Sequence, residues 1–284
     1  MILAKHPRFA IDTGGHRSVL AWRAHRGVGS AAQTRGKSAL PKSRNSLYSQ
    51  YMTLSRARQE DGIFIVIDGT DGSGKATQTK LLVKHLKKFG WRVSVADFPQ
   101  YRAKSAGPVE EYLNGKYGTA KEVGPYRASM FFAVDRYAAS FKIRRWLEEG
   151  RVVIGNRYVS ANLGHQGSHL PSAAARRKFF SWAEHLEYNL FGIPRPDLVL
   201  VTHVPAHLAQ KLVDLKGARS YIKKKRDLLE ADLAHLKRAE ATYLQMAREL
   251  KGYRLIECLD HGRLLSPKEV HQKIWQAVQA LLRR

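Results

Sequence analysis

The chain has 284 residues with a formal net charge of +25, and 44% of its residues are hydrophobic. This length accommodates one large α/β domain or two smaller ones, and the charge indicates anionic partners. The single cysteine, Cys258, excludes an intrachain disulfide and fits a reducing compartment such as the cytoplasm. Because no segment approaches the roughly 18 consecutive apolar residues of a membrane helix, we expect no membrane partner.

Residues 1–58 form a basic N-terminal extension with eleven lysines and arginines but one acid, Asp12. The stretch is rich in Gly, Ser, Ala and Arg, so it buries too little apolar surface to offset its ordering entropy, and we expect disorder and no catalytic role. Three interpretations stay open: an organellar targeting segment, a nucleic-acid-binding tail, or translation that begins at Met52. The folded domain is expected at 59–284.

Downstream of the extension, apolar runs typical of buried strands alternate with helical patterns. This alternation predicts right-handed βαβ units and a five-stranded parallel sheet covered by helices on both faces. Ligands then bind at the carboxyl ends of the strands. The expected strands are 63–68, 92–98, 151–156, 196–204 and 253–260, and the expected helices are 75–90, 125–150, 171–191, 227–250 and one that begins after Ser266.

The segment GTDGSGKATQ, residues 69–78, fits the phosphate-loop pattern G-x-x-x-x-G-K-[ST] except at Ala76, where a hydroxyl normally contacts Mg²⁺. The strand before it and the helix after it provide the context that the motif needs. Backbone N–H groups and the helix dipole would hold the phosphates of ATP. A hydroxyl from Thr77 or a water molecule would take the missing place on the metal. The expected phosphate-binding residues are Gly69, Asp71, Gly72, Ser73, Gly74, Lys75, Ala76 and Thr77.

Four stretches in this order and spacing, FIVIDGTDGSGKATQ, FFAVDRY, NRYVSANLGHQG and PDLVLVTHVP, resemble the thymidylate kinase family over about 62–284. The resemblance implies a P-loop NTPase-type three-layer αβα fold with a short lid. It also implies transfer of the ATP γ-phosphoryl group to dTMP, giving dTDP, with Mg²⁺ as cofactor. The family commonly forms dimers, so we expect a homodimer, in the cytoplasm.

The resemblance also implies roles in acceptor binding. Phe132 would stack on thymine and Arg136 would donate to its O4, and their spacing of four residues on a helix lets both face one pocket. Asp71 would approach the sugar 3′-hydroxyl, and Arg157 would contact the acceptor phosphate. The further acceptor residues that it implies are Phe98 at a strand end, Asn162 at the base edge and His165 beside the deoxyribose.

The sequence departs from the family pattern at several positions. Asn156 replaces an aspartate that helps organise the water shell of the metal, so Asn156 and Thr77 would act on Mg²⁺ through water. Tyr101 replaces an arginine, so Arg102 or Lys104 would supply the second phosphate contact.

Residues 216–226 lie where the family has a mobile lid over ATP. Some members carry a catalytic arginine in the phosphate loop, where this chain has Gly72. The arginine should therefore come from the lid, with Arg219 favoured over Arg226. Lys75, Arg157 and Arg219 are the expected catalytic residues, because phosphoryl transfer needs positive charge on the transferred oxygens.

Two alternatives remain open. The first is a related P-loop kinase that uses another nucleotide or a deoxynucleoside as acceptor. The second is a nucleotide- or RNA-binding protein with weakened catalysis, which Ala76 and Asn156 favour. Because Lys75, Arg136 and Arg157 are all present, we expect catalysis and do not expect a nucleic-acid partner.

Overall fold

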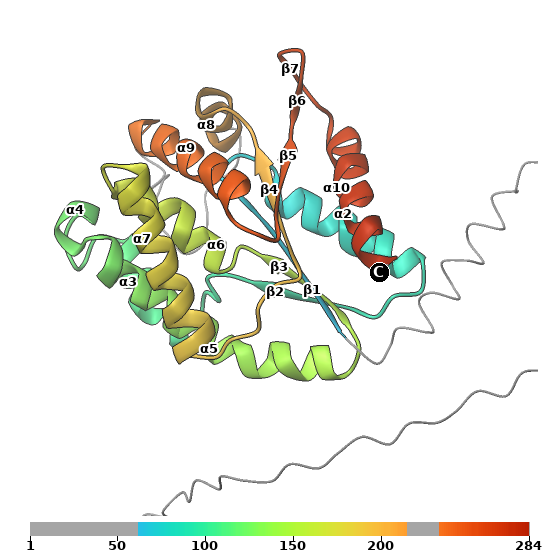
Figure 1. Cartoon of the computed structure of the whole chain (residues 1–284), viewed down its shortest axis with the longest axis horizontal. Coiled ribbons are helices and arrows are strands. Elements are labelled where there is room, and N and C mark those ends of the chain that lie inside the picture. The colour runs from blue at the N-terminus through green and yellow to red at the C-terminus, as the bar shows by residue number, and fades with distance from the viewer. Residues whose placement is uncertain (1–61, 215–232, 284) are drawn as a thin grey trace, which may run out of the picture. The chain divides into compact units, whose positions relative to one another are not determined.

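The computed structural model describes residues 62–214 and 233–283. Its centre is a parallel sheet with the strand order β2-β3-β1-β4-β5, which confirms the five strands expected from the sequence. Figure 1 shows these strands, which are β1 Ile63–Gly69, β2 Val93–Asp97, β3 Val152–Asn156, β4 Leu198–His203 and β5 Tyr253–Glu257.

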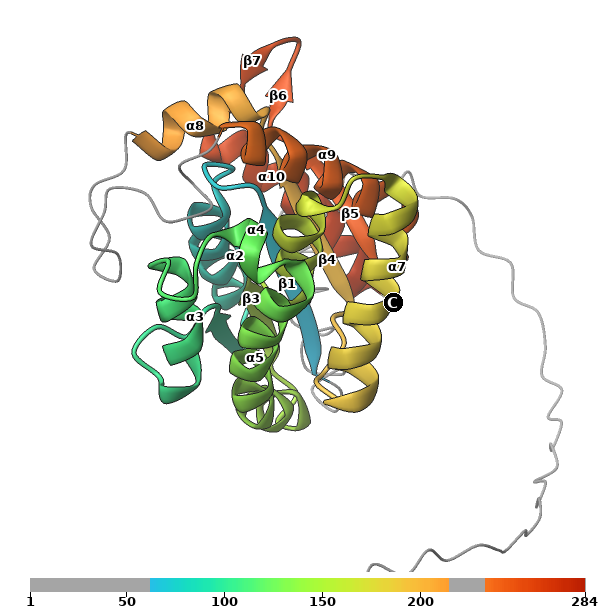
Figure 2. The ribbon, with the colours of Figure 1, turned by 90° about the vertical axis from the view of Figure 1, so that its left-hand side faces the viewer.

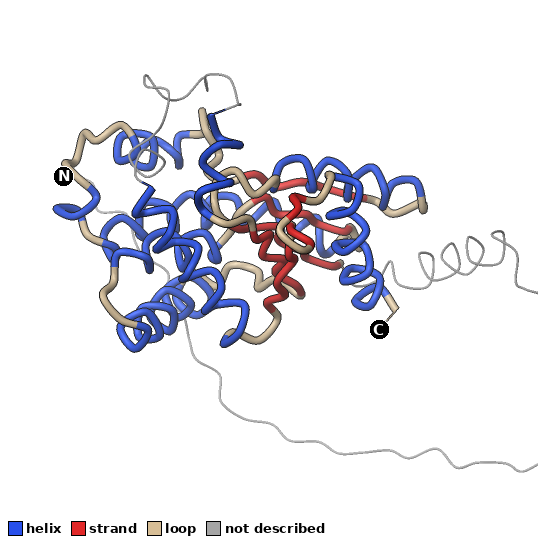
Figure 3. The backbone as a smooth tube through the Cα atoms, turned by 90° about the horizontal axis from the view of Figure 1, so that it is seen from above, coloured by secondary structure: helices blue, strands red, loops and turns tan. Residues whose placement is uncertain are grey.

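Helices cover both faces of the sheet, because alternate strand residues point to opposite sides. Ile65 and Ile67 of β1 pack with α2 (Lys75–Lys88) and α10 (Pro267–Leu282) on one face. Phe64 and Val66 pack on the other face with α5 (Pro125–Glu148), α7 (Ala173–Glu184) and α9 (Leu233–Glu249). Figure 3 shows the strands between these two sets of helices. The result is the expected three-layer αβα fold.

Local sequence signals set the ends of several helices. Pro125 lies in the first turn of α5, as expected, since its missing N–H would have no helical partner there. Ser266 caps α10 through a reciprocal capping box with Glu269, which was also predicted. Helix α7 continues beyond Glu184 as a π-helical turn, His185–Leu190, within the helix predicted for 171–191.

The predicted strand 253–260 is interrupted. Strand β5 ends at Glu257, and Leu259–Asp260 (β6) pairs antiparallel with Arg263–Leu264 (β7). The two residues between β6 and β7, His261 and Gly262, both have positive φ, of 46° and 79°, as a tight hairpin turn requires. Figures 1 and 2 show this hairpin beyond the end of β5.

Several short helical elements have no counterpart among the predicted elements, because they are shorter than the window over which hydrophobic periodicity can be recognised. Some of them pack a small cluster, which includes Val109, Tyr112 and Val123, against α5. These elements are Lys104–Ala106, α3 (Gly107–Leu113), α4 (Ala120–Val123), α6 (Val159–Ala161), Asn162–Gln166, Gly167–His169 and α8 (Ala206–Asp214).

The described residues include no helix long and apolar enough to cross a membrane. The lone cysteine, Cys258, is buried directly after β5, and burial raises the pKa of its thiol to about 12. The N-terminal extension 1–58, the lid 216–226 with Arg219 and Arg226, and the predicted start of the helix 227–250 lie outside the described residues.

Candidate active site

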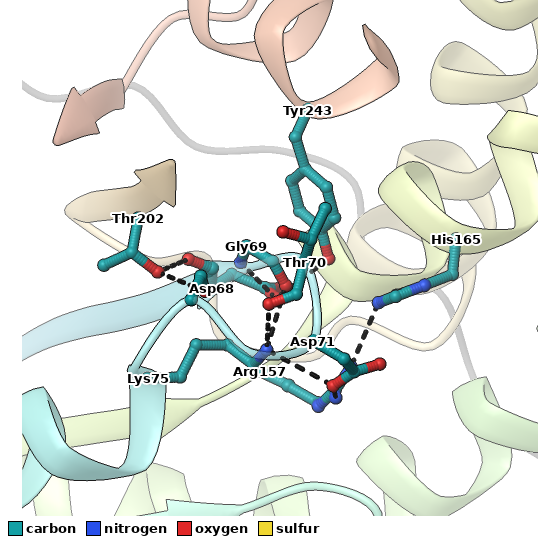
Figure 4. A network of polar contacts seen from close by, with 10 residues as sticks. Asp68, Gly69, Thr70, Asp71, Lys75, Arg157, His165, Thr202 and Tyr243 are labelled. Carbon is teal, nitrogen blue, oxygen red and sulfur yellow. Dashed lines mark hydrogen bonds and ion pairs between the residues drawn. The ribbon is translucent and has the colours of Figure 1, made fainter. Parts of the chain in front are cut away.

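The loop between β1 and α2 has the geometry of a phosphate-binding loop. Gly74, its last residue, adopts a left-handed conformation with φ 86° and precedes the first turn of α2. Lys75 donates from Nζ to the carbonyl oxygens of Gly69 and Thr70 at 3.0 and 2.8 Å, and it lies 3.5 Å from a carboxylate oxygen of Asp71. Figure 4 shows the ammonium group inside the curve of the loop. The positive end of the helix dipole faces the loop because α2 begins there, and no acidic side chain in the first turn of α2 offsets it.

Two glycines of this loop are required by close backbone approaches. A Cβ on Gly69 would lie 2.3 Å from the carbonyl oxygen of Thr202 at the end of β4. A Cβ on Gly72 would lie 2.1 Å from the carbonyl oxygen of Ala209 in α8. The structure therefore has no room at position 72 for an arginine side chain.

A buried carboxylate at the end of β1 fixes the loop through hydrogen bonds. Asp68 is fully buried and accepts hydrogen bonds from the backbone N–H of Gly69 at 2.8 Å, the hydroxyl of Ser160 at 2.5 Å and the hydroxyl of Tyr243 at 2.9 Å. These bonds join the loop to α6 and to α9, and Figure 4 shows Tyr243 of α9 reaching toward the loop. Asp68 and Tyr243 could not be paired from the sequence, because they lie 175 residues apart and follow no local pattern.

Arg157 links the loop to the end of β3. Its guanidinium group donates to the Asp71 carboxylate. The distance between Nη1 of Arg157 and Nε2 of His165 is 3.1 Å (Figure 4). Burial alone would lower the pKa of Arg157, but the Asp71 carboxylate and the weaker contributions of other nearby acidic groups together outweigh burial and raise that pKa above its ordinary value. Burial lowers the pKa of His165 well below 6.5. His165 is therefore neutral at physiological pH, and its Nε2 can accept from Arg157. The backbone of Arg157 has φ 65°, a conformation that costs a non-glycine residue energy and is often found at functional sites.

A second arginine lies at the other end of the site. Arg136 is almost fully buried and donates from Nε and Nη2 to both carboxylate oxygens of Glu187, at 2.5 and 2.7 Å. Burial opposes its charge, but Glu187 outweighs this effect and raises the pKa of Arg136. Asn162 donates from Nδ2 to Glu187 at 3.2 Å and to the carbonyl oxygen of Ser129 at 3.1 Å. Glu187 was not identified from the sequence, although it fixes the orientation of two predicted site residues.

The loop after β2 is held by a further carboxylate. Asp135, buried on α5, accepts from the backbone N–H of Gln100 at 2.8 Å and from the hydroxyl of Ser105 at 2.7 Å. It lies within the stretch FFAVDRY, where the resemblance predicts roles only for Phe132 and Arg136. These bonds fix the segment that carries Phe98 and Tyr101.

A cavity of about 390 Å³ connects the two arginines, and this volume lies in the range of small-molecule sites. The cavity does not include every predicted residue. Gly69 and Ser73 belong to the loop but do not line the cavity. Thr77 is exposed and does not line the cavity either. Tyr101 lines the cavity, whereas Arg102 does not. The predicted residues that line it are Asp71, Gly72, Gly74, Lys75, Ala76, Phe98, Phe132, Arg136, Asn156, Arg157, Asn162 and His165.

A second cavity of about 610 Å³ adjoins the first, and both are lined by Ala76, Asp97 and Asn156. Within the described ranges, Oδ1 of Asn156 is buried without a hydrogen-bond partner, and no cluster of three or more His, Cys, Asp or Glu side chains could enclose a metal ion. Carboxylate and amide oxygens beside a phosphate-binding loop fit Mg²⁺, which keeps several waters and needs few protein ligands.

Comparison with known proteins agrees with this geometry. The model of the thymidylate kinase family matches residues 67–259. Thymidylate kinase from Mycobacterium tuberculosis strain H37Rv is 30% identical over 215 residues, covering 73% of this chain and 99% of that protein. A probable thymidylate kinase from Pyrococcus abyssi is 29% identical and covers 75% and 94%. The solved structure of thymidylate kinase from Candida albicans superposes with a TM-score of 0.59 at 18% identity, covering 78% of this chain and 92% of that one, and it supports the fold. The chain belongs to the thymidylate kinase family.

Proposed function

We propose a division of roles within this cavity for the reaction that follows from the family. The chain is an ATP-dependent kinase that phosphorylates dTMP to dTDP. A phosphate oxygen of dTMP attacks the γ-phosphorus of ATP, and the bond between that phosphorus and the β,γ-bridging oxygen breaks, so that ADP leaves. The observation that best supports this proposal is that one cavity joins the phosphate loop to Arg157 and to the pair Arg136–Asn162.

The phosphate loop is the proposed site for the phosphates of ATP. Its backbone N–H groups and the N-terminus of α2 favour anions, and Lys75 adds a positive charge beside them. In the structure, Lys75 donates to carbonyl oxygens of the loop, and it would exchange these partners for phosphate oxygens when ATP binds.

The acceptor is proposed to lie along the same cavity. Phe132 offers an aromatic ring for thymine, while Arg136 and Asn162, both oriented by Glu187, offer donors for the polar edge of the base. At the opposite end, Arg157 and His165 face the acceptor phosphate and sugar, close to Asp71. Phe98 lines the wall between these ends.

Catalysis is proposed to depend on charge and positioning, since the attacking atom is already a phosphate oxygen and needs no strong base. Lys75 and Arg157, which line the same cavity, are proposed to place positive charge beside the reacting phosphates. The proposed third cation, Arg219, lies outside the described residues and stays a prediction. Asn156 is proposed to contact Mg²⁺ through water, and the metal would neutralise charge on the β- and γ-phosphates.

A homodimer is also proposed, in the cytoplasm as the resemblance implies. Helix α5 exposes a stripe of five large apolar side chains: Tyr126, Met130, Val134, Tyr137 and Phe141. At about 100° a residue, all five fall within roughly 80° of the helix circumference. Such a one-sided apolar face on a helix indicates a protein contact.

The function is tested by an ADP-release assay on the full chain with ATP, Mg²⁺ and a panel of nucleoside monophosphates and deoxynucleosides. We expect turnover to be highest with dTMP. Lys75→Met should lower turnover by about 10²–10³-fold, as the loss of one group that stabilises the transition state does. Lys88→Met, on the last turn of the same helix, should not.

Three outcomes would change the conclusion. Preferential turnover of another acceptor would reassign the base-binding residues. Equal losses in the two lysine variants would remove Lys75 from the reaction. ATP binding without turnover of any acceptor would indicate a binding protein.

A further inference from the structure

Two groups that commonly help to hold Mg²⁺ beside a phosphate loop are absent from this chain, and the two positions concerned line the same part of the site. Ala76 has no hydroxyl, and Asn156 has no charge. Both residues line the two cavities, and so does a third residue, Asp97, which belongs to none of the sequence motifs.

Strand register places Asp97 beside Asn156. The two residues are paired neighbours at the ends of β2 and β3. On β3, Asn156 lies two residues after Ile154, which packs in the core under α2, so Asn156 points to the α2 face. On β2, Asp97 lies two residues after Val95, which lines the second cavity with residues of α2. Side chains of paired strand residues on one face are close neighbours. The carboxylate that position 156 lacks is therefore present one strand further along the sheet.

A hydroxyl group lies nearby as well. Thr79 is three residues after Ala76 on α2, so both lie on one face of that helix, and both line the second cavity. Thr79 is 5% exposed, and its Oγ1 has no hydrogen-bond partner within 62–214 and 233–283. Because a buried hydroxyl without a partner is costly, this atom needs a water molecule or another polar group in the cavity.

We propose that Asp97, Asn156 and Thr79 together bind the water shell of the divalent cation that accompanies ATP, with Asp97 as its negatively charged member. This proposal rests on the proposed function. Mg²⁺ prefers oxygen donors and retains several waters, so a carboxylate, an amide oxygen and a hydroxyl around its hydration shell suit it. Asp97 is exposed, so a hydrated ion can reach it.

The lysines around this site make its affinity for a cation depend on whether nucleotide is bound. Lys80, Lys84 and Lys87 also line the second cavity, at roughly 6, 12 and 16 Å along α2 from Ala76 at 1.5 Å a residue. These cations disfavour a metal ion in the empty protein. Phosphates at the loop would reverse the local sign of charge, so the cation should bind well to the nucleotide complex and weakly without nucleotide.

The test is Mn²⁺ binding to the full chain saturated with ADP, followed by electron paramagnetic resonance of the unbound ion. Asp97→Asn should weaken Mn²⁺ binding about 10–100-fold, the usual effect of removing a partner of the outer coordination shell. The double variant Asp97→Asn/Asn156→Asp moves the charge back by one strand and should restore most of the affinity. Asp260→Asn, which removes an exposed carboxylate from β6, is the matched control and should bind Mn²⁺ like the wild type.

The outcomes separate this proposal from the proposed function. Equal Mn²⁺ affinity in Asp97→Asn and wild type, or equal losses in Asp97→Asn and Asp260→Asn, would overturn the role of Asp97. So would a double variant that binds no better than Asp97→Asn. If the wild type fails to phosphorylate dTMP but shows the expected pattern of Mn²⁺ binding, the proposed acceptor fails and the cation site stands.

Discussion

At the scale of single residues, Arg136 shows how the site combines burial with charge. It is among the largest side chains that are almost fully buried, and its charge is balanced by Glu187, which is fully buried as well. Removing one partner of such a pair leaves an uncompensated charge, which typically costs about 3–5 kcal/mol. The hydrogen bonds to Glu187 use Nε and Nη2, so the guanidinium plane is held in one orientation before any nucleotide binds.

Gly72 gives a prediction at the same scale. Gly72→Ala should destabilise the fold by more than the roughly 1–3 kcal/mol that a positive φ costs a non-glycine residue, because the new Cβ would also overlap the backbone of Ala209. Gly252→Ala is the matched control, since Gly252 has the same φ of 86° but no atom within 4 Å of a Cβ. Urea denaturation measures both free energies of unfolding. Similar losses in the two variants would show that α8 yields to the added methyl group.

The sequence predicted some of these residues and not others for a physical reason. Asp71, Lys75 and Arg157 lie in motifs whose spacing is local. Glu187 pairs with a residue 51 positions away, and no spacing rule indicates such a partner. Asp97 could not be predicted as a site residue, because its position beside Asn156 depends on the register of two strands that lie more than fifty residues apart in the sequence.

At the scale of elements, long helices and buried strands could be predicted because periodicity and caps are repeated signals along a segment. Short helices such as α3 and α8 could not, since they contain too few turns to show a period. The packing of one helix on another also depends on contacts between distant segments. The contact between α2 and α10 is an example with a measurable consequence.

His85 of α2 and His271 of α10 share a hydrogen bond of 2.8 Å between Nδ1 and Nε2, and His85 stacks on Trp275 with ring centroids 4.0 Å apart. Burial, then His271 and Lys88, lower the pKa of His85 to about 4, and burial lowers the pKa of His271. The stabilisation from the neutral pair is therefore complete above pH 6.5. It is lost as the pH falls from 6.5 toward 4, because the unfolded chain takes up protons that the folded chain excludes.

The prediction is that the free energy of unfolding falls between pH 7 and pH 5 and that His271→Gln makes this fall smaller. Comparison with a variant is needed because Glu240 and Glu257 outweigh burial and raise the pKa of His203, which has the opposite effect on the pH dependence. His261→Gln, at a side chain that is 98% exposed, is the control and should leave the slope unchanged. A slope that is the same in all three proteins would contradict the assignment to the pair.

At the scale of the whole molecule, the apolar stripe on α5 leads to a prediction about assembly. Val134→Glu, near the middle of the stripe, should convert a dimer to monomers, since a charge in the centre of an apolar interface is left without water. Sedimentation equilibrium measures the mass, and circular dichroism checks that the helices persist. Leu264→Glu alters an exposed apolar residue on β7 and should leave the mass unchanged. A wild-type monomer at micromolar concentration would contradict the proposed homodimer.

The buried Cys258 has a practical consequence for labelling the protein. With a thiol pKa of about 12 and a side chain closed off from solvent, it stays protonated and unreactive toward maleimides at neutral pH. Since the chain has no other cysteine, one introduced on the surface would be the sole fast-reacting thiol. Fluorescent dyes or spin labels could then be attached at chosen positions without first removing a native sulfur.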